Sequence, residues 1–248
     1  MGNTLSGKVV LVTGGSRGLG REMVLAFADA GADVIIASRK LDACGALATL
    51  VREKYGREAL PVACNVGDWA QCEALVEAAY TAFGQVDVLV NNAGMSLLYP
   101  SLDRVSEEMF DKVIATNLKG PFRLSALIAA RMAVAGTGSI VNISSIEASH
   151  PEPLAVPYAA AKAGLEAMGN GLARTYAPAV RVNTIRCGAF DTDIAKAWPP
   201  EMRDHLVQHT ALRRIGTPAD IVGAALYFAS DASAFCTGAT LALDGGYR

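Results

Sequence analysis

Residues 8–20 read KVVLVTGGSRGLG, a run of mostly β-branched residues that leads directly into a cluster of glycines. The run from Lys8 to Thr13 predicts a buried strand. A helical pattern follows as far as Ala30, and the apolar stretch from Asp33 to Ser38 predicts a second strand. Glycine permits the positive φ angles of a tight turn and lets the backbone approach a pyrophosphate at a helix N-terminus. The stretch therefore predicts a strand–turn–helix–strand unit with a nucleotide at the turn.

The spacing of the glycines leaves an alternative open. Gly14, Gly18 and Gly20 follow the pattern Gly-x-x-x-Gly-x-Gly, whereas the usual dinucleotide fingerprint is Gly-x-Gly-x-x-Gly. The fingerprint thus fits imperfectly, and a turn with a purely structural role is the competing interpretation.

The end of the second strand bears on the choice of cofactor. An acidic residue there would bind the ribose 2′-hydroxyl of NAD. This chain instead has Ser38-Arg39-Lys40, with no acid before Asp42. Guanidinium groups suit phosphate geometry, so Arg39 and Arg17 are suited to a 2′-phosphate. We predict that NADP(H) is preferred and keep NAD(H) as the alternative; two solvated arginines would be the interpretation without a ligand.

Strands and helices alternate along the rest of the chain, which predicts an α/β fold with a doubly wound parallel sheet of about seven strands and helices on both faces. No repeat, low-complexity segment or linker interrupts it, so residues 1–248 are expected to form a single domain. Further strands are predicted at 59–64, 86–90, 138–144, 180–185 and 240–243, and helices at 41–55, 68–83, 106–117, 120–134, 157–176 and 217–230.

Composition excludes several classes of protein. A net charge of -2 argues against a nucleic-acid partner, which needs a basic face. No apolar run is long enough to span a bilayer, and no signal peptide is evident. Five scattered cysteines predict reduced thiols and a cytoplasmic protein. His205 and His209 are four residues apart, but no third ligand accompanies them, so we predict a solvated helix face and no metal.

A second constellation lies between Ser145 and Lys162. Tyr158 and Lys162 are four residues apart, so on a helix they share a face, and Pro157 suits the first turn of that helix. A lysine ammonium one turn away favours the phenolate and lowers its pKa, and a shift of about three units, which requires about 4 kcal/mol, is expected when a cationic cofactor ring assists. Ser145 can hydrogen-bond to a substrate oxygen. The three predict proton transfer at that oxygen; the alternative is an amphipathic tyrosine beside a solvated lysine.

The ordered set of motifs resembles the short-chain dehydrogenase/reductase family over essentially the whole chain. The thirteen-residue step from Ser145 to Tyr158 matches the family's serine and selects Ser145 over Ser144. The matching motifs are Thr13-Gly14-x-x-x-Gly18-x-Gly20, Asn91-Asn92-Ala93-Gly94, Asn117, Ser145, Tyr158-x-x-x-Lys162 and Asp244-Gly245-Gly246. The resemblance implies a Rossmann-type domain that binds NAD(P) and an oxidoreductase activity.

The resemblance also implies roles for individual residues. Tyr158 would be the general acid in reduction and the base in oxidation, Lys162 would bind the nicotinamide ribose, and Ser145 would hold the substrate oxygen. Asn117 would kink its helix and hold a water that links Lys162 to solvent. The implied cofactor-binding residues, with Arg17 and Arg39, are Gly14, Ser16, Gly18, Leu19, Gly20, Ser38, Asn65, Val66, Asn92, Ala93, Gly94, Tyr158, Lys162, Gly188 and Thr192.

The chain departs from the family pattern at three places. Cys187-Gly188 replaces Pro-Gly, which we expect to loosen the loop after the sixth strand. Asn65-Val66 replaces Asp-Val, and the amide of Asn65 is expected to preserve adenine binding. The loop before Tyr158 is unusually polar, because it contains Glu147, His150 and Glu152. The substrate-pocket candidates are Met95, Ser96, Glu147, Leu154, Phe190 and Trp198.

The leading hypothesis is an NADP(H)-dependent reductase that converts a small-molecule carbonyl to a secondary alcohol, reversibly. An NAD-dependent alcohol, sugar or steroid dehydrogenase is the alternative within the enzyme class, and a non-catalytic NADP-binding regulator is the alternative from another class. The substrate stays open, since 3-oxoacyl thioesters, keto sugars, steroids and xenobiotic ketones all suit such a scaffold. Small residues on more than one side of the helix after Tyr158, together with the resemblance, predict a homotetramer, with a dimer as the alternative.

Overall fold

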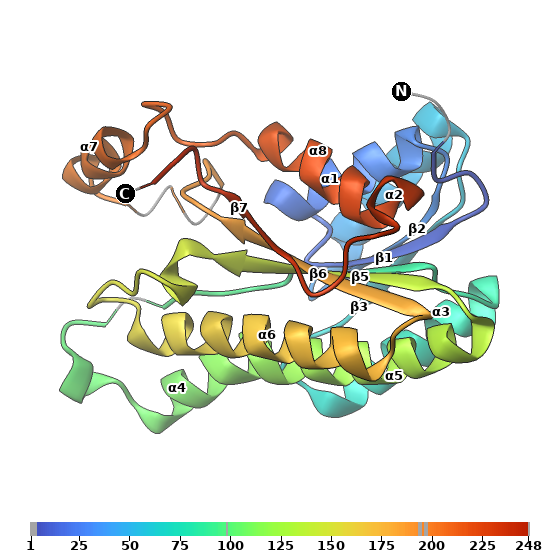
Figure 1. Ribbon diagram of the computed structural model, residues 1–248, viewed down its shortest axis with the longest axis horizontal. Coiled ribbons are helices and arrows are strands. Elements are labelled where there is room, and N and C mark those ends of the chain that lie inside the picture. The colour runs from blue at the N-terminus through green and yellow to red at the C-terminus, as the bar shows by residue number, and fades with distance from the viewer. Residues whose placement is uncertain (1–3, 98, 193–194, 196–197, 248) are drawn as a thin grey trace.

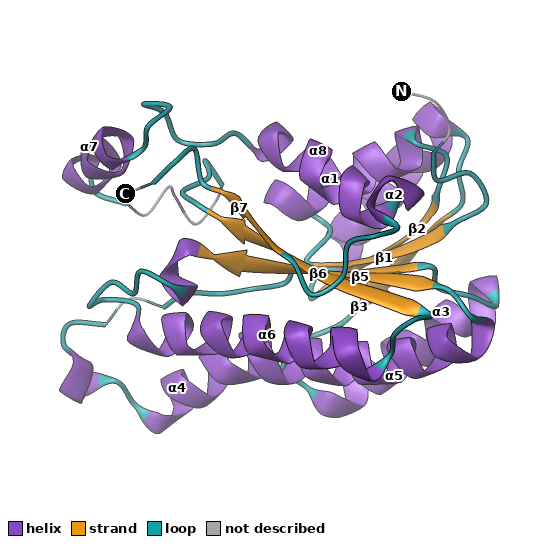
Figure 2. Ribbon diagram, in the orientation of Figure 1, coloured by secondary structure: helices purple, strands orange, loops and turns teal. Residues whose placement is uncertain are grey.

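The computed structural model describes residues 4–97, 99–192, 195 and 198–247. Within these residues, seven strands form one sheet in the order β3-β2-β1-β4-β5-β6-β7, and every neighbouring pair is parallel (Figure 2). The strand order reverses between β1 and β4, and open α/β sheets bind ligands at such a point. The strands are β1 Val9–Thr13, β2 Asp33–Ser38, β3 Ala59–Ala63, β4 Val88–Asn91, β5 Gly138–Ser145, β6 Val180–Cys187 and β7 Thr240–Leu243.

Helices cover both faces of the sheet (Figure 1). On one face lie α1, α2 and α8; on the other lie α3, α4, α5 and α6. Helix α7 stands apart from both layers, on the side to which β5 and β7 point. The bounds are α1 Gly18–Asp29, α2 Leu41–Tyr55, α3 Trp69–Phe83, α4 Glu107–Ile114, α5 Gly120–Ala135, α6 Val156–Thr175, α7 Pro200–His209 and α8 Val222–Ala229.

The sheet is buried on both sides, which explains why its strands are continuous apolar runs rather than alternating ones. Val10 and Val12 of β1 point into a core shared with Phe27 of α1. Leu11, between them, points into the opposite core together with Leu124 of α5. Each such side chain, when fully buried, stabilises the fold by about 1.5–3 kcal/mol. The predicted fold class is confirmed.

The structure differs from the predicted element bounds near the centre of the sheet. Strands β5 and β6 continue to Ser145 and Cys187, because these two residues still pair across the strands. The predicted break between two helices near Asn117 is instead a π-helical turn, Ala115–Lys119, that joins α4 to α5. The Asn117 side chain donates to the Val113 carbonyl oxygen (2.9 Å), which helps to satisfy an acceptor in this widened turn.

None of the helices in the described part of the chain is long and apolar enough to cross a membrane. All five cysteines are thiols, and four of them are buried.

Candidate active site

A cleft of about 1560 Å³ opens at the carboxyl ends of the central strands. This exceeds the roughly 300–1,000 Å³ of a usual small-ligand pocket and leaves room for a dinucleotide together with a substrate. With the exception of Asn117, every residue predicted for catalysis, cofactor binding or the substrate pocket lines this cleft. The topology thus brings together residues that lie as far apart in the chain as Gly14 and Trp198.

The glycine turn is packed against the end of β4 so closely that side chains are excluded. A Cβ atom on Gly20 would lie 2.2 Å from the Gly14 carbonyl oxygen. Gly14 itself has a φ angle of +62°, in the left-handed region. The Asn92 side-chain amide donates to the carbonyl oxygens of Thr13 (2.8 Å) and Gly14 (3.2 Å). Asn92 therefore holds the turn in place. The sequence suggests only that Asn92 lies beside the ribose, and it does not predict this structural role.

The end of β2 presents polar groups and a cation to the cleft. Ser38 and Arg39 both line it, and Arg39 is exposed. The Ser38 hydroxyl lies 3.0 Å from the Cys44 sulfur. Asp42, the first acid after β2, does not line the cleft.

The end of β3 places Asn65 on the cleft wall. Its side-chain oxygen accepts the Gly67 N–H at 3.2 Å, and its own N–H donates to the Gln71 side chain at 2.9 Å. The amide oxygen thus stabilises the turn between β3 and α3.

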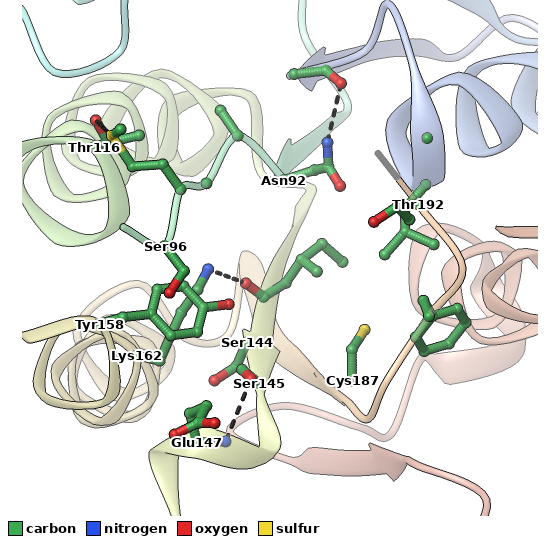
Figure 3. Close-up of a pocket in the computed structure, with 18 of the residues that line it drawn as sticks. Asn92, Ser96, Thr116, Ser144, Ser145, Glu147, Tyr158, Lys162, Cys187 and Thr192 are labelled. Carbon is green, nitrogen blue, oxygen red and sulfur yellow. Dashed lines mark hydrogen bonds between the residues drawn. The ribbon is translucent and has the colours of Figure 1, made fainter. Parts of the chain in front are cut away.

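Lys162 is a buried cation on the inner face of α6. Its ammonium donates to the Ile143 carbonyl oxygen at 2.7 Å, and Nζ lies 5.6 Å from the centre of the Tyr158 ring (Figure 3). Burial lowers the pKa of Lys162 to about 8, against the opposing effects of Cys187 and Glu166. The ammonium is still the main form at pH 7.

The Tyr158 hydroxyl is directed into the cleft (Figure 3). Burial raises the pKa of this phenol, and its hydrogen bond with Ser145 acts in the opposite direction. The lowering of this pKa by Lys162 together with a cationic cofactor ring stays a prediction, because in the polypeptide by itself the net effect is upward. The physical reason is that desolvation disfavours the phenolate more strongly than the neighbouring groups stabilise it.

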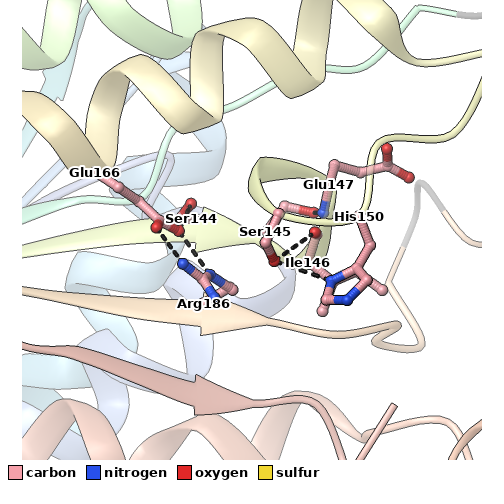
Figure 4. Close-up of polar contacts among 8 residues, drawn as sticks. Ser144, Ser145, Ile146, Glu147, His150, Glu166 and Arg186 are labelled. Carbon is pink, nitrogen blue, oxygen red and sulfur yellow. Dashed lines mark hydrogen bonds and ion pairs between the residues drawn. The ribbon is translucent and has the colours of Figure 1, made fainter. Parts of the chain in front are cut away.

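Adjacent serines at the end of β5 point to opposite sides, as the pleat of a strand requires. The Ser144 hydroxyl donates to the Glu166 carboxylate (2.8 Å), which also accepts from Arg186 Nε (2.9 Å) (Figure 4). Ser145 Oγ instead accepts the N–H of Glu147 at 3.3 Å. Ser144 is thus held in an ion-pair cluster, whereas Ser145 adjoins Tyr158.

Asn117 does not reach the cleft wall, because it is fully buried behind Met95. Its side chain accepts the Met95 N–H (3.2 Å) and donates to the Met95 carbonyl oxygen (2.8 Å). A Cβ atom on Gly94 would lie 3.0 Å from Asn117 Oδ1 and 3.5 Å from Lys162 Nζ. Asn117 therefore positions Gly94 and Met95, which lie between it and Lys162. The link from Asn117 to Lys162 through water stays a prediction.

The segment after β6 is tied down, contrary to the expectation that Cys187 would loosen it. The Gly188 N–H donates to the Leu243 carbonyl oxygen at 3.0 Å, and a Cβ atom on Gly188 would lie 2.7 Å from Asp244 Cα. Burial raises the pKa of Cys187 to about 12, so this cleft residue is a neutral thiol. Farther along the segment, a Cβ atom on Gly18 would lie 3.6 Å from Thr192 Cγ2, so the glycine turn and this segment face each other.

All six substrate-pocket candidates line the cleft, although Phe190 is also a core residue that packs against Gly216. Sequence reasoning missed Met202, His205 and Leu206 of α7 and Tyr247 near the chain end. His205 was predicted to lie on a solvated face; it is exposed but also borders the cleft. No sequence motif marks these residues, because α7 and the chain end reach the cleft only through tertiary packing. Among the described residues, no group of three or more His, Cys, Asp or Glu side chains is arranged to hold a metal.

A doubly wound parallel sheet with a glycine turn and a Ser–Tyr–Lys set in one cleft defines a Rossmann-type oxidoreductase. The family model described as Enoyl-(Acyl carrier protein) reductase matches residues 14–248. The chain belongs to the short-chain dehydrogenase/reductase family, and it is an enzyme of that family.

Several relatives are similar over nearly the whole chain. The chain is 36% identical to the 3-oxoacyl-[acyl-carrier-protein] reductase FabG of Thermotoga maritima, with 98% of both chains covered. It is 34% identical to the sorbose reductase sou1 of Schizosaccharomyces pombe, with 98% of this chain and 97% of the relative covered.

Solved structures show the same architecture. A gluconate 5-dehydrogenase from Burkholderia cenocepacia, in complex with NADP and tartrate, has a TM-score of 0.93 at 31% identity and covers 98% of this chain and 96% of its own. A 7α-hydroxysteroid dehydrogenase complexed with NADH and 7-oxo glycochenodeoxycholic acid has a TM-score of 0.94 at 32% identity and covers 99% of this chain and 96% of its own.

Proposed function

We propose that this protein is an NADP(H)-dependent oxidoreductase that reduces a carbonyl to a secondary alcohol, reversibly, with Tyr158 as the general acid or base. The observation that carries the proposal is the convergence of Ser145, Tyr158 and Lys162, from β5 and α6, in the cleft that also contains the glycine turn. A regulator that only binds a nucleotide would not need this arrangement of proton-transferring groups.

The residues divide the work as follows. Ser145 Oγ holds the substrate oxygen, and the Tyr158 hydroxyl gives that oxygen its proton in reduction and takes it back in oxidation. Lys162, oriented by its hydrogen bond to Ile143, presents its ammonium to the nicotinamide ribose and to the phenolate. When bound, the nicotinamide supplies the hydride, and the positive charge of its oxidised ring favours the phenolate. That charge opposes the rise in the pKa of Tyr158 that burial causes.

The preference for NADP(H) is supported by the residues around the end of β2. Ser38, Arg39 and Arg17 line the cleft, and none of the described wall residues at the end of β2 is an acid that could accept a ribose 2′-hydroxyl. The Burkholderia relative was solved with NADP, whereas the hydroxysteroid dehydrogenase was solved with NADH. An NAD-dependent oxidising enzyme is therefore the second candidate.

Cofactor titration tests the preference. Purified protein should bind NADPH more tightly than NADH, and Arg39→Gln should weaken NADPH binding by about tenfold, a loss of about 1.4 kcal/mol, while NADH binding changes little. Tighter binding of NADH by the wild type would overturn the assignment.

Turnover tests the role of Tyr158. A screen of carbonyl compounds that follows NADPH absorbance would identify a substrate. With that substrate, Tyr158→Phe should lower kcat by about 10²–10⁴-fold and keep cofactor binding. Tyr227→Phe is the matched control, because Tyr227 lies on α8 and does not line the cleft. Equal turnover in Tyr158→Phe and the wild type would refute the mechanism.

We also propose a cytoplasmic homotetramer, with a dimer as the alternative. The location is supported by the unpaired state of the cysteines. Assembly is supported by exposed apolar side chains on the outer side of the α4–α6 layer, where Leu102, Phe110 and Val156 line a shallow groove of about 330 Å³. Sedimentation equilibrium distinguishes a tetramer from a dimer, and a monomer would contradict both.

A further inference from the structure

The catalytic end of the cleft carries carboxylates on its wall. Glu147 and Glu152 lie in the segment between β5 and α6, immediately after Ser145, and both line the cleft. Figure 4 shows Glu147 and His150 on the side of Ser145 opposite the cluster formed by Ser144, Glu166 and Arg186. No basic side chain of that cluster therefore faces Glu147.

The two glutamates are held near the reacting groups. A Glu147 carboxylate oxygen accepts the Glu152 N–H at 2.8 Å, and the Glu147 N–H donates to Ser145 Oγ at 3.3 Å. Burial is the main cause that raises the pKa of Tyr158, and the Glu147 charge adds to it. Burial likewise raises the pKa of Tyr247, with smaller contributions from Glu152 and Glu147. The two carboxylates thus act on phenols on both sides of this end of the cleft.

The lysines and arginines of the cleft wall lie elsewhere, and the basic side chains at this end, apart from Lys162, are the imidazoles of His150 and His205. The other cations come from the glycine turn, the end of β2, α4 and the π-helical turn, and they are Arg17, Arg39, Lys40, Lys112 and Lys119. The described wall residues of the β5–α6 segment, the loop after β6, α7 and the chain end include no lysine or arginine. Arg203 of α7 is not a wall residue, and it pairs with Asp191 at 3.1 Å.

This distribution of charged side chains predicts which carbonyl compounds the cleft accepts. A carboxylate or phosphate near the carbonyl would meet Glu147 and Glu152 as like charges, whereas hydroxyl and ammonium groups would find carboxylate acceptors. We propose that the substrate presents hydrogen-bond donors, hydroxyl or ammonium, beside its carbonyl and carries no anionic group there, and that Glu147 and Glu152 determine this selectivity. The inference rests on the proposed function and specifies its substrate class.

Four cyclohexanones of similar size, substituted at position 4, test the selectivity: 4-amino, 4-hydroxy, 4-methyl and 4-carboxylate. We expect the wild type to reduce the amino or hydroxy compound with the highest kcat/KM and the carboxylate with the lowest, about tenfold below the methyl compound. If kcat/KM is highest for the amino compound, the substrate bears an ammonium group. If kcat/KM is highest for the hydroxy compound, the substrate belongs to the polyol class.

Charge-neutralising variants connect the selectivity to the two glutamates. Glu147→Gln and Glu152→Gln should each raise the carboxylate-to-methyl ratio of kcat/KM several-fold, whereas Glu53→Gln, an equal charge change on the exposed face of α2, should leave that ratio unchanged. If Glu147→Gln does not fold, Glu152→Gln carries the test, because the Glu152 side chain is exposed and its hydrogen bond to Glu147 is made by the backbone N–H, which the substitution keeps.

Two results would overturn the inference. The first is a wild type that reduces the carboxylate as well as the methyl compound. The second is a ratio that neither glutamine variant changes. Either result would leave the proposed reductase activity intact, whereas no reduction of any of the four ketones with either cofactor would overturn that function and this inference together.

Discussion

Replacing Lys162 by methionine should stabilise the fold at neutral pH while it abolishes turnover. The side chain is 3% exposed, so its ammonium has been removed from water. Burial lowers its pKa from the ordinary 10.5 to about 8. Methionine has a similar length and no charge, so it removes the cost of burying the ammonium with little change in packing.

The size of the effect follows from the pKa. Each tenfold change in proton affinity is worth about 1.36 kcal/mol. The fall in the pKa of Lys162 from 10.5 to about 8 therefore corresponds to about 3 kcal/mol. Losing the hydrogen bond from Nζ to the Ile143 carbonyl oxygen offsets about 1 kcal/mol of this gain. The expected net stabilisation by Lys162→Met at pH 7 is therefore about 2 kcal/mol.

The pH dependence identifies the cause. Below pH 8 both the folded and the unfolded chain hold the proton, and the cost of the buried charge is present in full. Between about pH 8 and 10.5 the unfolded chain binds more protons than the folded chain, so the wild type gains stability as pH rises. The advantage of Lys162→Met should therefore shrink over this window.

Urea unfolding at pH 7 and at about pH 9.5 measures the effect, with Lys54→Met, an exposed lysine on α2, as the control. Lys54→Met should show no pH-dependent gain. A Lys162→Met protein that is no more stable than the wild type at pH 7, or whose advantage does not fall with pH, would refute the reasoning.

Three further predictions concern neighbouring residues. Ser145→Ala should lower kcat by about 10²-fold or more with little change in the free energy of unfolding. Ser144→Ala should instead lower the free energy of unfolding by about 1–3 kcal/mol and keep turnover. A steady-state assay and urea unfolding of both variants separate these roles, and reversed losses would contradict them. Gly20→Ala should abolish nucleotide binding, measured by calorimetry, because its Cβ would lie 2.2 Å from the Gly14 carbonyl oxygen; unchanged affinity would show that the turn can relax. Asn117→Ala should lower the free energy of unfolding by about 2–3 kcal/mol, because buried backbone groups lose their partners, and a neutral result in urea would argue against that support.

Much of the fold could be predicted from the sequence because its signals are local. β-Branched runs predict strands, helical spacing of apolar residues predicts helices, and their alternation predicts a parallel sheet. The glycine turn could be predicted for the same reason, since Gly14 needs a positive φ angle that other residues avoid. The thirteen-residue step to Tyr158 indicated Ser145 rather than Ser144, and the structure shows why: the pleat directs Ser144 to Glu166.

Other properties depend on segments that are distant in the chain. The contribution of α7 and Tyr247 to the cleft has no sequence signal, because it arises when Thr210, the residue after α7, pairs with Tyr247 near the chain end. The pKa of Tyr158 was also beyond sequence reasoning. Spacing along a helix reveals that a lysine is near, but it does not reveal how much water the surrounding strands exclude.

The sequence by itself determined the order of the elements and the position of the glycine turn, and it indicated the candidate proton-transferring side chains, because each of these signals lies in residues that are close along the chain. Only the tertiary structure decided the electrostatic character of the cleft. Charges from the end of β2, α4 and the β5–α6 segment add through space, and their sum depends on which ends of the cleft they border.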